Sequence, residues 1–322
     1  MFIDGASVNL PHFILFIMQI KLRIYLLLFA FILCLIYGLL KLNINTQITF
    51  LIIVLVVFGV PHGALDLYID QYLQKSDAHQ GAFLIKYVLN ILVYSLVWYF
   101  FPIWALVIFI LITAFHFGEV DWIGKNNLFI HKLIYTLLGL SWILFLLSKN
   151  IEFAITIFFK MGRSNISESN LMMMANKVYP FSLAAIVAIY LVLFFFKSKF
   201  FLKEHHYYYS MIQFGTLILF AFFAPLWICF AFYFGFWHSL LSFDKIRKAF
   251  NIPNTFNGWK ELLIKSMPFS IMAWFGFAFV TFQTLNSKDS SGVFTLIFIT
   301  LSVLALPHLQ IFTKLRFPTE NK

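Results

Sequence analysis

Residues 24–40 read IYLLLFAFILCLIYGLL, an unbroken run of apolar and small residues without a single charge. A helix rises about 1.5 Å per residue, so a run of this kind approaches the roughly 30 Å thickness of a hydrocarbon core. Comparable runs of 15 to 22 residues recur along the 322-residue chain. We therefore predict an all-α fold, a bundle of helices that crosses a membrane several times.

The composition of the whole chain indicates the same fold class. Hydrophobic residues make up 62% of the chain, charged residues only 11%, and the mean hydropathy is +0.89. A water-soluble domain cannot carry that much apolar surface. The apolar runs also lack the period-two alternation that a transmembrane β-barrel requires.

Ten spans are expected, all within one integral-membrane domain that covers residues 1–322. Their approximate bounds are 22–40, 47–66, 84–101, 103–118, 128–147, 180–196, 208–224, 226–243, 267–284 and 292–312. The more polar segment 151–178 is expected to form a loop with an interfacial helix. Pro102 and Pro225 each divide a long apolar stretch, and proline interrupts a helix, so each stretch should form two short helices or one strongly broken helix.

The charges and cysteines limit the possible binding partners and the orientation of the chain in the membrane. The net charge is +10, but the basic residues, Lys21 and Arg23 among them, are placed in short loops between apolar runs. This pattern favours contact with membrane lipid over binding of nucleic acid, and the positive-inside rule places both termini in the cytoplasm. The first apolar run is read as a retained helix and not as a signal peptide. Cys34 and Cys229 lie inside apolar runs and suggest neither a disulfide framework nor a cysteine metal cluster.

Four histidines lie inside apolar segments, at His62, His116, His238 and His308. In the ten-span topology they fall on four different helices, at similar depth in the cytoplasmic half of the membrane. An ionisable side chain at such a depth indicates a functional site by default. Converging neutral imidazoles suit a divalent transition metal, because imidazole binds iron, zinc and copper. A four-histidine iron site would leave coordination positions for dioxygen and a substrate.

Carboxylates follow two of these histidines closely. Asp66 lies four residues after His62 on the helical period, and Glu119 and Asp121 follow His116. A carboxylate beside a ligating imidazole accepts its second N–H, fixes its tautomer and raises its basicity. We therefore expect these three acids to support the ligating rings.

The remaining histidines are expected to be solvated, because they precede the first span or lie in loops and a charged connection. They are His12, His79, His131, His205 and His206.

Aromatic residues make up 20% of the chain and surround the central histidines, as in AFHFGEVDW and FAFYFGFWHSLL. Some of these rings must point inward, and a channel lined by flat aromatic rings suits a long polyene.

At these residues the chain resembles the Brp/Blh family of membrane β-carotene dioxygenases. The resemblance is carried by PHGALD at 61–66, HFGEVD at 116–121, WHSLLS at 237–242 and LPH at 306–308, in family order across most of the chain. It implies an all-helical enzyme of the bacterial cell membrane that uses Fe²⁺ and O₂ to split the central double bond of β-carotene into two all-trans-retinal molecules. It also implies that His62, His116 and His238 bind iron, and that a retinal-binding rhodopsin receives the product.

The third motif departs from the family pattern. That pattern resembles W-H-S-x-x-H, with a second ligand one helical turn after the first, and this position is Ser242 here. A hydroxyl is a poor substitute for imidazole on Fe²⁺. Either His308 completes the ligand set, or three histidines and water bind the iron, or the chain has lost the cleavage activity.

Two other functions stay open. A carotenoid- or retinal-binding membrane module without turnover would hold the polyene and leave it whole. A proton-coupled transporter would use the buried His and Asp residues as a relay and would need no metal. A membrane desaturase or hydroxylase is disfavoured, because its clustered His pairs are not matched by His205–His206 in a charged connection.

Overall fold

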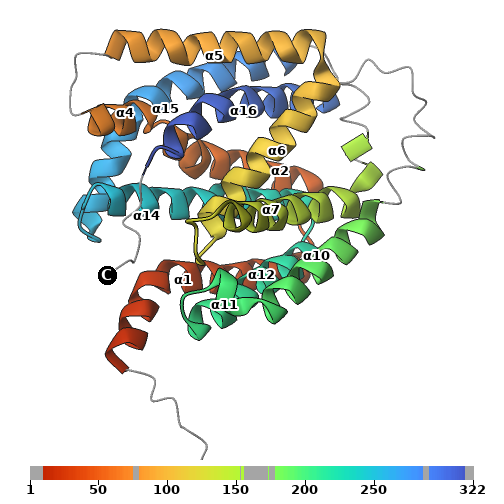
Figure 1. Ribbon diagram of the computed structural model, residues 1–322. Coiled ribbons are helices and arrows are strands. Elements are labelled where there is room, and N and C mark those ends of the chain that lie inside the picture. Colours follow the sequence, from red (N-terminus) through yellow and green to blue (C-terminus); the bar gives the residue numbers. More distant parts are fainter. Residues whose placement is uncertain are drawn as a thin grey trace, which may run out of the picture.

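The apolar runs of the sequence form helices that cross one another around a common centre (Figure 1). The computed structural model describes residues 10–74, 80–152, 154–155, 173, 178–285 and 290–315, and these residues contain no strand. Nearly all of the loop expected over 151–178 lies outside them. The longer helices are α1 (Leu10–Leu40), α2 (Ile44–Val54), α4 (Asp66–Gln74), α5 (Gln80–Phe100), α6 (Pro102–Asp121), α7 (Phe129–Lys149), α10 (Val178–Phe195), α12 (Glu204–Phe223), α14 (Ser239–Ala249), α15 (Phe256–Leu285) and α16 (Ser290–Phe312). The shorter ones are α3 (Val60–Gly63), α11 (Lys197–Phe200), α13 (Leu226–Phe230) and two π-helical segments, η1 (Leu55–Gly59) and η2 (Ala231–His238).

Among the described residues, eight helices or continuous helical segments are long and apolar enough to cross a membrane. They correspond to eight of the ten expected spans and indicate a multi-pass membrane protein. The expected span 208–224 forms α12, which begins with the polar residues Glu204, His205 and His206 and is not among the eight. The expected span 292–312 forms α16, of which Phe298–Phe312 counts as a shorter apolar helix.

Proline interrupts both long stretches, as predicted. Helix α5 ends at Phe100 and α6 begins at Pro102, while α12 ends at Phe223 and Pro225 is the N-cap of α13. Proline has no N–H to continue the helical hydrogen bonds, so a new helix starts in a new direction. Figure 1 shows this for α5 and α6, which form a V. After each break, the next helical segment returns into the bundle and carries a central histidine, His116 or His238.

Helices α6 and α7 make a close backbone contact that depends on two glycines. A Cβ at Gly118 would overlap the carbonyl oxygen of Tyr135, and a Cβ at Gly139 would overlap that of Ala114. Glycine lets membrane helices approach one another in this way. The contact fixes the second half of α6, which carries His116.

A buried arginine closes the end of α6. The Arg23 guanidinium donates hydrogen bonds to the carbonyl oxygens of Val120 (2.7 Å) and Asp121 (3.0 Å) and to Oε1 of Gln213 (2.8 Å). Gln213 Nε2 also donates to the Asp121 carbonyl, at 3.0 Å. The last carbonyls of a helix have no partner within it, so this arginine satisfies them and joins α1, α6 and α12. Arg23 is therefore an internal residue and not a loop charge.

Candidate metal centre

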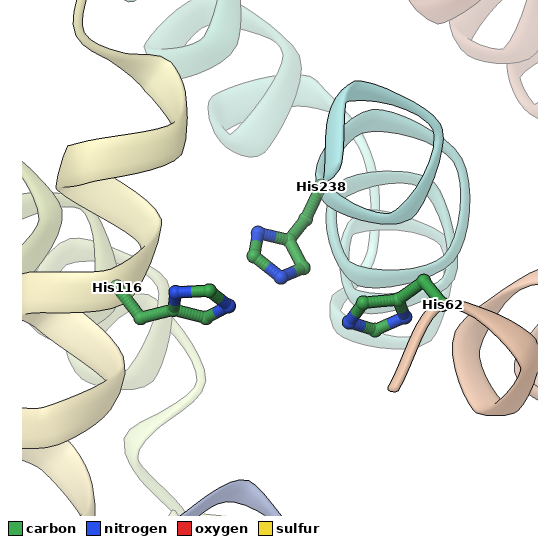
Figure 2. Close-up of side chains that lie close together, drawn as sticks. All are labelled: His62, His116 and His238. Atoms are coloured by element: carbon green, nitrogen blue, oxygen red, sulfur yellow. The ribbon is translucent and has the colours of Figure 1, made fainter. Parts of the chain in front are cut away.

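Three of the four predicted histidines meet in the interior. His62, His116 and His238 each offer a ring nitrogen, and these nitrogens lie within 4.8 Å of one another, a group that could hold a metal ion. The three side chains are only 4%, 7% and 1% exposed. Figure 2 shows the rings arriving from separate helical segments and facing a common space.

The fourth histidine, His308, borders this group from α16. Its ring centroid lies 5.1 Å from that of His62 and 5.2 Å from that of His116. Its Nδ1 is hydrogen-bonded to Asp66, and its Nε2 is buried without a hydrogen-bond partner among the described residues. All four histidines that the sequence singled out are therefore neighbours in space.

The donor set of the centre fits a transition metal. Within the described part of the chain, both ring nitrogens of His116, Nδ1 of His238 and Nε2 of His308 are buried and make no hydrogen bond. Buried polar atoms are nearly always paired, and leaving one unpaired costs about 1–3 kcal/mol. A metal ion bound by these nitrogens would remove that cost, because neutral imidazole nitrogens are good ligands for such ions.

Neighbouring oxygens determine which nitrogens of His62 and His308 face the centre. Oδ1 of Asp66 lies 2.8 Å from Nδ1 of His308, so this nitrogen carries the hydrogen and Nε2 keeps its lone pair. Ser239 Oγ donates to the Phe234 carbonyl at 2.7 Å and lies 3.1 Å from His62 Nδ1. A hydroxyl has one hydrogen, so here it accepts from His62 Nδ1–H. Both rings thus present Nε2 as a ligand atom.

Two π-helical segments position His62 and His238. Segment η1 (Leu55–Gly59) lies just before Pro61 and His62, and η2 (Ala231–His238) ends at His238 itself. Pro61 has no N–H and its ring crowds the carbonyl four residues earlier, which favours a wider turn at this point. The two segments pack against each other, and η2 also lies close to the end of α2, where a Cβ at Gly235 would overlap the side chain of Val54. π turns are rare and are often found at functional sites.

Asp66 contacts a different histidine from the one suggested by its position. Helical spacing placed it one turn after His62, but α3 ends at Gly63 and α4 begins at Asp66, so the helix is interrupted between them. The carboxylate instead bonds His308 and accepts a hydrogen bond from the Tyr87 hydroxyl at 3.0 Å. Tyr87, which sequence reasoning did not identify, lies in α5 and also lines the cavity described below.

Asp121 stabilises the segment around His238 through its neighbours. It makes no hydrogen bond to a histidine ring among the described residues. Its carboxylate accepts hydrogen bonds from the Tyr233 hydroxyl and from Trp237 Nε1, both at 2.7 Å. Trp237 immediately precedes His238. Asp121 therefore ties the end of α6 to the segment that carries His238.

Glu119 is half-buried and Ser242 is fully buried. Ser242 is 0% exposed, and its hydroxyl makes no hydrogen bond within the described residues, as is true of Oε2 of Glu119. Lys245 Nζ donates to the backbone carbonyl of Glu119 at 2.6 Å. Neither Glu119 nor Ser242 orients a histidine ring by a hydrogen bond in the part of the chain that the structure describes.

The histidines lie on the wall of an apolar cavity of about 510 Å³, within the range typical of small-molecule sites. All four histidines and Asp66 line it, and most other lining residues are aliphatic or aromatic. Among the aromatic rings of the lining, Phe117 and Phe234 contact His238, and Trp142 stacks on Tyr233. This lining offers burial and stacking to a long apolar ligand and very few polar partners.

Two histidines that were expected to be solvated are buried. His131 is 2% exposed, accepts from the Leu128 N–H through Nδ1 at 3.3 Å and donates to the Lys199 carbonyl at 3.0 Å. His206 is 5% exposed and lies in the first turn of α12. His131 is buried because the connection 196–203 folds back onto α7, where Lys199 and Phe200 contact its ring. His205 is half-buried, and His79 and the side chain of His12 lie outside the described residues.

Comparison with known proteins indicates the same family as the four histidine-containing sequence motifs. The family model described as Beta-carotene 15,15'-dioxygenase matches residues 53–316, which include all four central histidines. A curated protein from an uncultured marine bacterium 66A03, named Beta-carotene 15,15'-dioxygenase, is 42% identical over 71 residues. That alignment covers 21% of this chain and 26% of the relative, and no solved structure matches the chain. Because the family model matches well over half of its length, the chain belongs to the beta-carotene 15,15'-dioxygenase family.

Proposed function

We propose that this chain is an iron-dependent membrane oxygenase that cleaves the central double bond of β-carotene with O₂ and releases two all-trans-retinal molecules. The main support is the set of buried imidazole nitrogens on the wall of an apolar cavity, in a chain of the beta-carotene 15,15'-dioxygenase family. His62, His116 and His238 would hold the iron, with His308 as the fourth ligand. Bound Fe²⁺ would supply the activation of dioxygen.

The residues around the centre would position the polyene and keep water out. Phe117 and Phe234 pack against His238 at centroid distances of 4.6 and 5.9 Å, and Trp142 stacks on Tyr233 at 3.7 Å. A polyene offers only π faces and C–H edges, so aromatic walls are suited to hold it. The same walls leave little room for water beside the double bond that reacts.

Hydrogen bonds to Nδ1 of His62 and His308 keep the other ring nitrogen of each unprotonated and available as a ligand. Asp66 holds a proton on Nδ1 of His308, and Ser239 holds one on Nδ1 of His62. The lone pairs of the opposite nitrogens therefore face the centre without any proton transfer. Such supporting partners typically change metal affinity by about 10- to 100-fold.

A carotenoid-binding module without turnover is the second candidate, and Ser242 favours it. This residue stands where the family pattern has a histidine, and a hydroxyl supplies a much weaker ligand. In the first proposal His308 takes over that role from another helix. In the second, the cavity holds the polyene intact.

The proposed function also includes a cellular location and a partner for the product. We place the chain in a bacterial cell membrane, with both termini in the cytoplasm, because the basic loops gather on one side of the expected topology. Carotenoid and O₂ both dissolve in the lipid, and a retinal-binding rhodopsin would receive the product.

Expression in a host that accumulates β-carotene tests the function. We expect wild type to bleach the cells and form retinal, and His116→Ala to leave the pigment intact. His205 is a half-buried histidine that does not line the cavity, so His205→Ala is the matched control and should behave as wild type. Bleaching by His116→Ala would contradict the role of the centre.

Purified protein separates the two candidates. An oxygenase should contain about one iron per chain and convert β-carotene to retinal when reductant and O₂ are added. A binding module should retain β-carotene through the same incubation. Protein that is free of iron after expression in iron-rich medium would count against the oxygenase.

A further inference from the structure

The cavity reaches the outer surface of the bundle at α15. Met272 and Gly276 both line it, and both are exposed, Met272 by 67%. The two residues are one helical turn apart, so they share one face of α15. Ala273, next to Met272, also lines the cavity and is half-buried, which connects the exposed flank to the interior.

Gly276 leaves this part of the surface open. A Cβ at this position would meet no atom within 4 Å, whereas Gly118 and Gly139 are each required by a close contact. Glycine within a helix costs about 1 kcal/mol relative to alanine, and helix packing among the described residues does not explain that cost here. Of the glycines that meet no neighbour, Gly38, Gly81 and Gly276, only Gly276 lines the cavity.

This exposed flank lies on a helical segment that could cross a membrane. Met272 and Gly276 fall within Phe256–Phe279, one of the segments long and apolar enough to cross a membrane. Their exposed neighbours on α15 are apolar as well, including Phe275 at 73% and Phe279 at 63%. A surface of this kind faces hydrocarbon and not water.

The cavity also has exposed lining residues on α5, and these differ from the ones on α15. On α5, Leu84 and Val88 are 38% and 51% exposed and line the cavity with branched side chains. At α5 both exposed lining residues thus carry branched side chains, whereas at α15 Gly276 carries none.

From these observations we infer that the cavity opens sideways into the membrane at Met272 and Gly276, and that a long apolar carotenoid passes through this opening from the acyl-chain layer to the histidines. The inference rests on the proposed function only for the identity of the ligand. Met272 and Gly276 are then the residues that limit which carotenoids reach the centre.

The test compares two exposed glycines without close contacts, of which Gly276 lines the cavity and Gly38 does not. Gly276→Phe places a ring in the opening, and Gly38→Phe places the same ring on α1, where a Cβ also meets nothing within 4 Å. The full-length chain, kept free of metal, is reconstituted in lipid nanodiscs and mixed with vesicles that carry β-carotene. Uptake is followed as quenching of tryptophan fluorescence, to which Trp142 on the cavity wall should contribute.

We expect Gly276→Phe to slow uptake by roughly tenfold, equivalent to about 1.4 kcal/mol on the barrier, and Gly38→Phe to match wild type. Met272→Trp should slow uptake in the same direction. Uptake at the wild-type rate by Gly276→Phe would overturn the inference, and so would slow uptake by Val88→Trp alone.

A retinal assay on iron-loaded samples separates this inference from the proposed function. If uptake depends on Gly276 but wild type makes no retinal, the opening stands and the oxygenase proposal fails. If wild type makes retinal but Gly276→Phe takes up β-carotene normally, the opening is wrong and the oxygenase proposal stands.

Discussion

The carboxylate of Asp66 and Nδ1 of His308 lie 2.8 Å apart, although 242 residues separate them in the chain. The pair joins the start of α4 to α16, and the Tyr87 hydroxyl adds α5 to the same carboxylate. One carboxylate thus connects three helices through two hydrogen bonds and orients a ring at the centre. Loss of this carboxylate should lower metal affinity more than it lowers the stability of the fold.

Asp66→Asn should lower metal affinity by about 10- to 100-fold, the effect usual for losing a carboxylate behind a ligating histidine. The side chain keeps its shape, but its neutral amide no longer favours a proton on Nδ1 of His308. Competition with a chelator of known affinity measures the change. Asp70→Asn is the matched control, because Asp70 is also buried but accepts from Gln74. Equal affinities in the two variants would contradict the assignment.

His308→Ala should weaken metal binding, and adding Ser242→His should restore much of it. Residue 242 lies one helical turn after His238, so a histidine there would return an imidazole to the position of the family pattern. Metal content after dialysis against a chelator, measured for the single and double variants, checks this. A double variant that binds no more metal than His308→Ala would show that His308 and residue 242 do not substitute for each other.

Gly118→Ala should destabilise the protein by about 1–3 kcal/mol, the range for overpacking a close contact. The added methyl would overlap the Tyr135 carbonyl oxygen and push α7 away from α6. Unfolding in mild detergent, followed by circular dichroism, gives the free-energy difference. Gly38→Ala, in open space on α1, should be neutral or slightly stabilising.

Arg23→Gln should cost about 1–3 kcal/mol for each buried carbonyl left without its donor. Val120 and Asp121 would lose these bonds at the end of the helix that carries His116. Lys21→Gln removes a charge two residues earlier at an exposed position and serves as the control. The same unfolding assay applies, and equal stability of both variants would mean that water replaces the guanidinium.

Much of the fold could be predicted from the sequence, because burial in lipid demands long apolar helices and proline ends them. The breaks at Pro102 and Pro225 were confirmed for that reason. What hydropathy does not encode is which faces meet. Contacts such as that between Gly118 and Tyr135 depend on the shape of both helices, and the π turns depend on a local widening that leaves residue types unchanged.

The convergence of four histidines was predictable because ionisable groups stand out in apolar segments and a topology assigns each one a depth. The supporting residues did not stand out. Tyr87 and Ser239 are ordinary residues in membrane helices, and their roles come from partners far away in the chain. For Arg23 a signal did exist: a cation at the start of an apolar run can be internal, but charge counting assigned it to a loop.

The π turns before His62 and at His238 make the centre sensitive to chain length. Each residue advances an α-helix by about 100°, and a π turn holds one residue more than an α turn. Deleting one residue from η1 or η2 would therefore rotate the adjoining ring out of the cavity while leaving hydropathy, charge and motif letters unchanged. Relatives of this chain should tolerate exchanges of side chains in these two turns far better than any gain or loss of a single position.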